Sequence, residues 1–173
     1  MFDLVDLDIQ TRELAVAELD ADVAAGTVYM SPRLSNYGRS CFPGDLRAAL
    51  EEGTPETLEH LLQSGGKLNL TEMSQRNGVS YEKRVPNNAA SLLAGGAYVH
   101  YYLRAICLRA IQRGDARVTV YRARESGFHR PESDSQIGKV LDAAILLENF
   151  RRYSAEPVRI ELPDVGSGLA LHL

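Results

Sequence analysis

Apolar residues near the start of the chain recur with the period of a helix. Between positions 7 and 25 they form one narrow stripe, and the acidic residues lie largely off it. The stripe consists of Ile9, Val16, Leu19 and Val23. Gly26 follows as a typical helix stop. This spacing predicts a helix that docks on another surface and does not form the centre of a core.

Two further helices are predicted before position 66. The polar segment 33–41 indicates an irregular loop, and a helix then runs from position 43 to Gly53. The next helix begins after Thr54, a residue type that suits an N-cap, with Pro55 at its first position. Together these patterns predict a small helical hairpin.

From position 67 the period of the pattern changes from about 3.6 to 2, as in strands. Asn77 and Gly78 stand between two alternating runs, and this pair is the strongest two-residue signal for a β-hairpin because both positions tolerate positive φ. The flanking runs are polar. The sequence therefore predicts a hairpin that is exposed on at least one face and projects from the molecule.

The most apolar helical segment spans positions 97–113. It is apolar over most of its circumference, so we expect it to be the central buried helix. Before it, Asn88 is expected to cap a short turn that Gly95 and Gly96 interrupt.

The rest of the chain mixes strands and helices. Strands are expected at 117–122, at 157–162 and at the alternating end of the chain, with a helix after Asp142 as its cap. Because no βαβ repeat is visible, the pattern predicts an α+β fold with a small, mostly antiparallel sheet and peripheral helices around the central helix. Residues 1–26 are interpreted as an acidic docking arm, and 27–173 as a single domain.

Charge is distributed unevenly along the 173 residues. The formal net charge of −4 argues against a general nucleic-acid binder, and no apolar run is long enough to span a membrane. Residues 1–31 hold seven acids against one arginine, whereas residues 104–139 hold eight bases against four acids. These two regions can neutralise each other within one chain or between neighbouring copies.

Few motifs of known chemistry occur. Cys41 and Cys107 have neither disulfide-framework nor zinc-ligand spacing, and we assign no catalytic, cofactor-binding or metal-binding residue. One dense polar cluster lies in or beside the long segment 123–138, which has no regular period. Its members are Arg122, Arg124, Glu125, His129, Arg130, Glu132 and Asp134. An enzyme could use Glu132 or His129 for proton transfer there, but a loop that binds a partner explains the same residues.

Several short segments together resemble a family of small, largely uncharacterised proteins associated with tailed bacteriophages and prophages. These segments are TREL at 11–14, YMSPRLS at 29–35, YYLRAIC at 101–107, VYRA at 120–123, RPES at 130–133 and GSGL at 166–169. The resemblance implies a virion protein of the head region and supplies no catalytic residues.

The leading hypothesis is a structural protein of the phage head or neck, such as a decoration protein, a minor capsid protein or a head–tail connector. It would be made in the host cytoplasm, would reside in the virion, and would bind copies of itself or the major capsid protein, without a cofactor, a membrane or nucleic acid. Two alternatives remain. One is a small hydrolase or transferase with its site at 122–134, and the other is an intracellular regulator that binds one protein.

Overall fold

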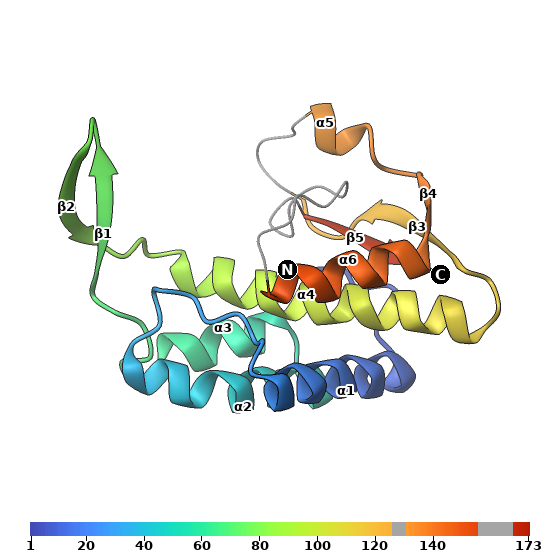
Figure 1. Cartoon of the computed structure of the whole chain (residues 1–173), viewed down its shortest axis with the longest axis horizontal. Helices are drawn as coiled ribbons and strands as arrows, with labels where there is room; N and C mark the ends of the chain where they lie inside the picture. Colours follow the sequence, from blue (N-terminus) through green and yellow to red (C-terminus); the bar gives the residue numbers. More distant parts are fainter. Residues whose placement is uncertain (126–130, 156–167) are drawn as a thin grey trace.

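The computed structural model describes residues 1–125, 131–155 and 168–173. The fold is α+β, as predicted, with helices on both sides of one long helix and two small antiparallel sheets (Figure 1). The described helices are α1 (Ile9–Ala25), α2 (Asn36–Glu52), α3 (Pro55–Gln63), α4 (Ala89–Gln112), α5 (Pro131–Asp134) and α6 (Ala143–Ala155). The described strands are β1 (Thr71–Arg76), β2 (Val79–Arg84), β3 (Arg117–Arg122), β4 (Val140–Asp142) and β5 (Leu169–His172).

Helix α4 is the central buried helix and lies between two hydrophobic cores. The helical core packs Tyr98 and Tyr101 of α4 against α1, α2 and α3. The sheet core packs Tyr102 and Ile106 of α4 against β3, β5 and α6. Apolar side chains of α4 point into both cores, so the helix is apolar around most of its circumference. This is the pattern from which its central position was predicted.

The predicted break before the central helix is wrong, because α4 begins at Ala89 and runs through Gly95 and Gly96. A β-carbon at Gly95 would lie 3.0 Å from the ring of Phe2, so this glycine makes room for an aromatic side chain from the start of the chain. Packing on both sides of α4 outweighs the low helix propensity of glycine, which costs about 1 kcal/mol per residue. Asn88 does precede the helix, but its side chain makes no capping hydrogen bond.

Helix α2 also begins earlier than predicted, at Asn36, so the segment 33–41 is not an irregular loop. The Ser35 hydroxyl caps the helix by accepting a hydrogen bond from the Gly38 backbone N–H at 2.9 Å. Pro43, predicted to open the helix, lies inside it. The predicted cap of α3 is confirmed, because Thr54 forms a capping box with Thr57.

The three-stranded sheet has the order β4-β3-β5 and is antiparallel throughout. The segment 123–138, which has no regular period in the sequence, contains α5, and strand β4 follows it. The cap at Asp142 is confirmed, because its Oδ1 accepts hydrogen bonds from the backbone of Ala144 and Ile145 at 2.9 and 3.0 Å. The strand predicted at 157–162 lies outside the described residues.

Strands β1 and β2 form a separate two-stranded hairpin with a full register from Thr71–Arg84 to Arg76–Val79. Asn77 and Gly78 have φ values of 51° and 79°, as the two-residue turn requires. The hairpin extends away from the helices (Figure 1), which confirms the prediction that it projects.

Candidate protein-interaction surfaces

The apolar stripe of α1 is divided between the interior and the surface. Leu19 is fully buried in the helical core and Val16 nearly so, whereas Ile9 is 76% exposed and Val23 is 48% exposed. Helix α1 therefore docks on α2 and α4 of its own chain and still presents apolar residues outward. The division of the chain at residue 26 into an arm and a domain stays a prediction.

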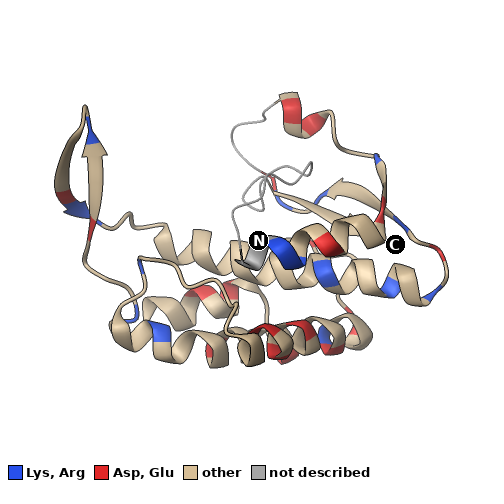
Figure 2. Ribbon diagram, viewed as in Figure 1, with Lys and Arg blue, Asp and Glu red and all other residues tan. Residues whose placement is uncertain are grey.

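Acidic residues gather on α1, and basic residues lie on α4 above it (Figure 2). Arg104 of α4 donates hydrogen bonds from Nε to Glu18 Oε2 at 2.8 Å and from Nη1 to Asp22 Oδ2 at 2.6 Å. Its side chain is 2% exposed. The uneven charge seen in the sequence is thus partly neutralised inside one chain.

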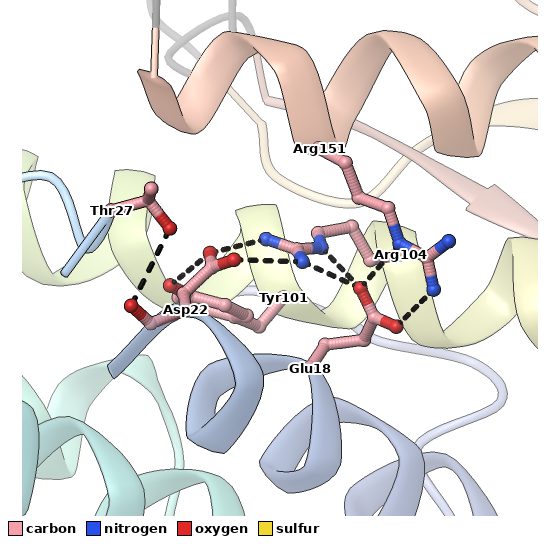
Figure 3. A network of polar contacts seen from close by, with 6 residues as sticks. All are labelled: Glu18, Asp22, Thr27, Tyr101, Arg104 and Arg151. Carbon is pink, nitrogen blue, oxygen red and sulfur yellow. Dashed lines mark hydrogen bonds and ion pairs between the residues drawn. The ribbon is translucent and has the colours of Figure 1, made fainter. Parts of the chain in front are cut away.

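Two more side chains complete this network, the buried Tyr101 and the half-exposed Arg151 (Figure 3). Arg151 of α6 donates from Nε to Glu18 Oε2 at 3.0 Å, and the Tyr101 hydroxyl donates to Asp22 Oδ2 at 2.9 Å. Two carboxylates therefore face two guanidinium groups, and the contacts join α1, α4 and α6. Such a balanced network fixes the relative positions of three helices.

The network perturbs the ionisation of its members. Burial alone would raise the pKa values of Glu18 and Asp22, but their arginine partners more than offset this and hold both pKa values below the usual range. Next to them, burial and the charge of Arg104 lower the pKa of His100 from 6.5 to about 4. Both carboxylates are therefore ionised and His100 is neutral at pH 7.

A second contact fixes the beginning of α1. Asp8 caps this helix by accepting a hydrogen bond from the Thr11 backbone at 3.0 Å, which, with the help of Arg109, lowers the pKa of Asp8. Arg109 of α4 donates from Nη1 to Asp8 Oδ1 at 2.9 Å and to Thr11 Oγ1 at 2.6 Å. Helix α1 is therefore attached to α4 through charged contacts at two places along its length.

The polar cluster predicted around the long segment is only partly assembled in the described residues. Arg122 forms an ion pair with Asp134. Arg124 lies over the ring of Phe2, with its guanidinium carbon 5.2 Å from the ring centroid, and Glu132 is exposed on α5. His129 and Arg130 lie outside the described residues.

The projecting hairpin exposes apolar side chains that no other described element covers. Met73 is 70% exposed, Val79 67% and Tyr81 42%. Because opposite residues of an antiparallel pair share a face, the register places Arg76, Val79 and Tyr81 together near the turn. We call these three residues the tip face.

The base of the hairpin is anchored. Glu72 accepts a hydrogen bond from Arg33 Nε at 2.6 Å and pairs with Lys83 at 3.2 Å. Glu72 near the helices is thus paired with two cations, whereas neither Arg84 at the base nor Arg76 near the turn has an ion-pair partner among the described residues. The hairpin is therefore anchored at its base and exposed at its turn.

A groove of about 500 Å³ runs between α1 and α2. We call it the α1–α2 groove, and it is lined by Ile9, Arg12, Glu13, Val16, Ala17, Asp20, Arg47, Glu51 and Glu52. Arg12 Nη1 donates to the backbone carbonyls of Leu50 and Gly53 at 3.0 and 2.9 Å, and Arg47 pairs with Asp20 and Glu51. Glu13 and Glu52 make no ion pair with any described residue, so the groove has an excess of negative charge.

Sequence reasoning missed this groove, although it identified two of its apolar residues. Ile9 and Val16 belong to the predicted docking stripe, but α2 was expected to begin only at position 43, and nothing indicated which of its faces would lie beside α1. The exposed hairpin was predicted, whereas its separation into two faces became visible only through the register.

Other kinds of site are not supported by the described part of the chain. It contains no group of three or more His, Cys, Asp or Glu side chains that could hold a metal, and none of its helices has the length and hydropathy to cross a bilayer. Burial raises the pKa of the Cys107 thiol to about 12, so this cysteine is a packing residue.

Comparison of the chain with protein-family models, with curated proteins and with solved structures finds no match.

Proposed function

We propose that this protein is a structural component of a bacteriophage particle, in the head or the neck, and that it acts by binding other virion subunits, including copies of itself. The observation that carries the proposal is the two-stranded hairpin, which extends from the helices and exposes Met73, Val79 and Tyr81. A projecting apolar element of this kind is typical of a contact that forms between chains.

The energetics of the hairpin favour a binding role. An isolated two-stranded hairpin is only marginally stable in water, so this one depends on its anchored base and on whatever its free end contacts. Covering side chains such as Val79 and Met73 contributes roughly 1.5–3 kcal/mol each when burial is complete. The hairpin thus gains stability on binding that it lacks in the single chain.

The body that carries the hairpin suits a structural role. The network of Arg104, Glu18, Asp22 and Arg151 ties three helices together, and α4 lies between two cores. A subunit of a shell or ring benefits from a stiff body because its contacts then repeat with the same geometry in each copy. The resemblance of short segments to a phage-associated family supplies the class of partner, other virion proteins.

Particles purified from the phage that encodes the chain provide the test. We expect mass spectrometry to find the chain at a constant ratio to the major capsid protein. Absence of the chain from complete particles would contradict the proposal, as would an enzymatic activity that is lost when Glu132 is replaced by Gln.

Among the described residues, removing the hairpin costs the rest of the chain the ion pair of Arg33 with Glu72. The backbone N–H of Val85 donates to the carbonyl of Leu70 at 3.0 Å, so the two ends of the hairpin already meet and a short glycine-rich turn can replace residues 71–84. This variant should melt cooperatively but no longer enter particles. As the matched control, Ile145→Ser removes an exposed apolar side chain from α6 and should enter particles as the wild type does.

A further inference from the structure

We infer that the tip face of one copy docks in the α1–α2 groove of a second copy, so that identical chains join head to tail. This inference rests on the proposed function and names the partner of the hairpin as another molecule of the same chain. The two surfaces occur once in each chain and complement each other in charge and in polarity.

Charge complementarity identifies the occupant of the groove. Arg76 on the tip face has no ion-pair partner among the residues that the structure describes, and Glu13 and Glu52 in the groove have none either. Charges of opposite sign on two surfaces steer those surfaces together and fix how they meet. The hairpin brings a cation to a groove with surplus carboxylates.

The apolar residues complement each other as well. The groove contains Ile9, which is largely exposed in the single chain, beside Val16 and Ala17. The tip face offers Val79 and Tyr81 next to Arg76. Tyrosine and arginine are enriched among the few residues that contribute most of the binding energy at protein interfaces.

The arrangement of the two surfaces requires different chains to meet. In Figure 1 the hairpin extends upward from one end of the molecule, whereas α1 and α2 lie along the opposite side. A hairpin therefore does not reach the groove of its own chain. Because the contact uses two different surfaces, it repeats from copy to copy and produces either a closed ring or a filament.

Reversing one charge tests the tip face. Arg76→Glu should weaken self-association at least about tenfold in sedimentation velocity over a concentration series, because like charges would then meet in the groove. Arg84→Glu is the matched control. It makes the same charge change on the same hairpin, but the register puts Arg84 on the opposite face, so the association should stay within about threefold of the wild type.

The groove is tested by the complementary variant, Glu13→Arg with Glu52→Arg. Alone, it should lose self-association to the same extent as Arg76→Glu, because its unchanged tip face would then meet a basic groove. Mixed in equal amounts, the two variants should assemble again, with copies of the two kinds alternating. In such a mixture the reversed tip face meets the reversed groove and the unchanged tip face meets the unchanged groove, so both contacts join opposite charges.

Several results would overturn the inference. They are a wild-type chain that stays monomeric at every concentration, an Arg76→Glu variant that assembles normally, and a mixture that fails to recover assembly although both variants melt cooperatively. If hairpin removal blocks entry into particles while the groove variant enters normally, the hairpin binds a different protein. The head-to-tail contact is then wrong, and the proposed function stands.

Discussion

Arg104 of α4 and Glu18 of α1 are 86 positions apart in the chain and share a hydrogen bond of 2.8 Å, with side chains that are 2% and 8% exposed. Placing two charges in such a position is costly unless both find partners, and here each has more than one. The pair is therefore an interior contact that joins the N-terminal helix to the centre of the fold.

Replacing Arg104 by Met should destabilise the protein by about 3–5 kcal/mol, because it leaves Asp22 and part of Glu18 buried without a counter-charge. Chemical denaturation gives the free energy of unfolding. The control is Arg152→Met, which removes an arginine whose pair with Glu148 is exposed at 54% and 72%, and it should change the stability by no more than about 0.5 kcal/mol. Equal losses of stability in the two variants would show that the buried ion pairs contribute no more to stability than an exposed one.

Leu19→Ala and Ile106→Ala should each cost about 2–5 kcal/mol, because both side chains are fully buried, one in each core. Ile9→Ala should change the stability by less than about 0.5 kcal/mol in the single chain. This expectation differs from the docking arm predicted from the sequence, which would not form part of a core. Denaturation curves of the three variants give the free energies of unfolding. A Leu19→Ala variant that loses little stability would favour an independent docking arm.

Gly38→Ala should destabilise the protein strongly, by about 3 kcal/mol or more, since the new β-carbon would lie 1.9 Å from the carbonyl oxygen of Lys67. Gly44 lies in the same helix and has nothing within 4 Å of such a carbon. Gly44→Ala should therefore stabilise the protein by up to about 1 kcal/mol through helix propensity. Thermal melts of both variants suffice, and a tolerated Gly38→Ala would mean that α2 does not approach the Lys67 backbone this closely.

The stability of the protein should fall as the pH drops from 6.5 to about 4, the interval between the unfolded and folded pKa values of His100. In that interval the unfolded chain binds a proton that the folded one does not, so unfolding becomes more favourable on acidification. At about 1.4 kcal/mol per pKa unit, the total loss is on the order of 3 kcal/mol. The buried carboxylates Glu18 and Asp22 have lowered pKa values, so their contribution is lost only at lower pH.

A histidine variant separates these effects. His100 packs edge-on against Tyr101 and Phe150, and His100→Gln should flatten the dependence of the unfolding free energy on pH between about 6.5 and 4.5. His60→Gln, at an exposed position on α3, should leave the slope as it is in the wild type. An unchanged slope in the His100 variant would assign the pH dependence to other groups.

Signals carried by neighbouring residues were sufficient for much of the fold. Asn77 and Gly78 predicted the hairpin because few other pairs adopt both positive φ values, and Thr54 and Asp142 predicted helix starts because their side chains cap the backbone. Apolar side chains around most of the circumference of the segment 97–113 indicated a central helix, because only a helix with neighbours on all sides can bury them all.

Features that depend on distant contacts were missed. Gly95 looked like a helix break because nothing local shows that Phe2 occupies the space beside it. Likewise, the sequence indicated that an acidic segment could meet a basic one, but it did not show that Glu18 would lie between Arg104 and Arg151. The α1–α2 groove belongs to this class, because it exists only where two helices are already packed.

The position of α4 between two cores also has a consequence for the order in which the chain folds. Every buried residue of the helical core lies between Ala15 and Ala105, whereas the sheet core needs residues from Val99 to Leu171. During synthesis the helical core can therefore fold before β5, the strand that completes the sheet core, has been translated. Domains generally form as soon as their residues are available, so we expect folding from the N-terminus in two stages, with β5 added last to a partly finished molecule.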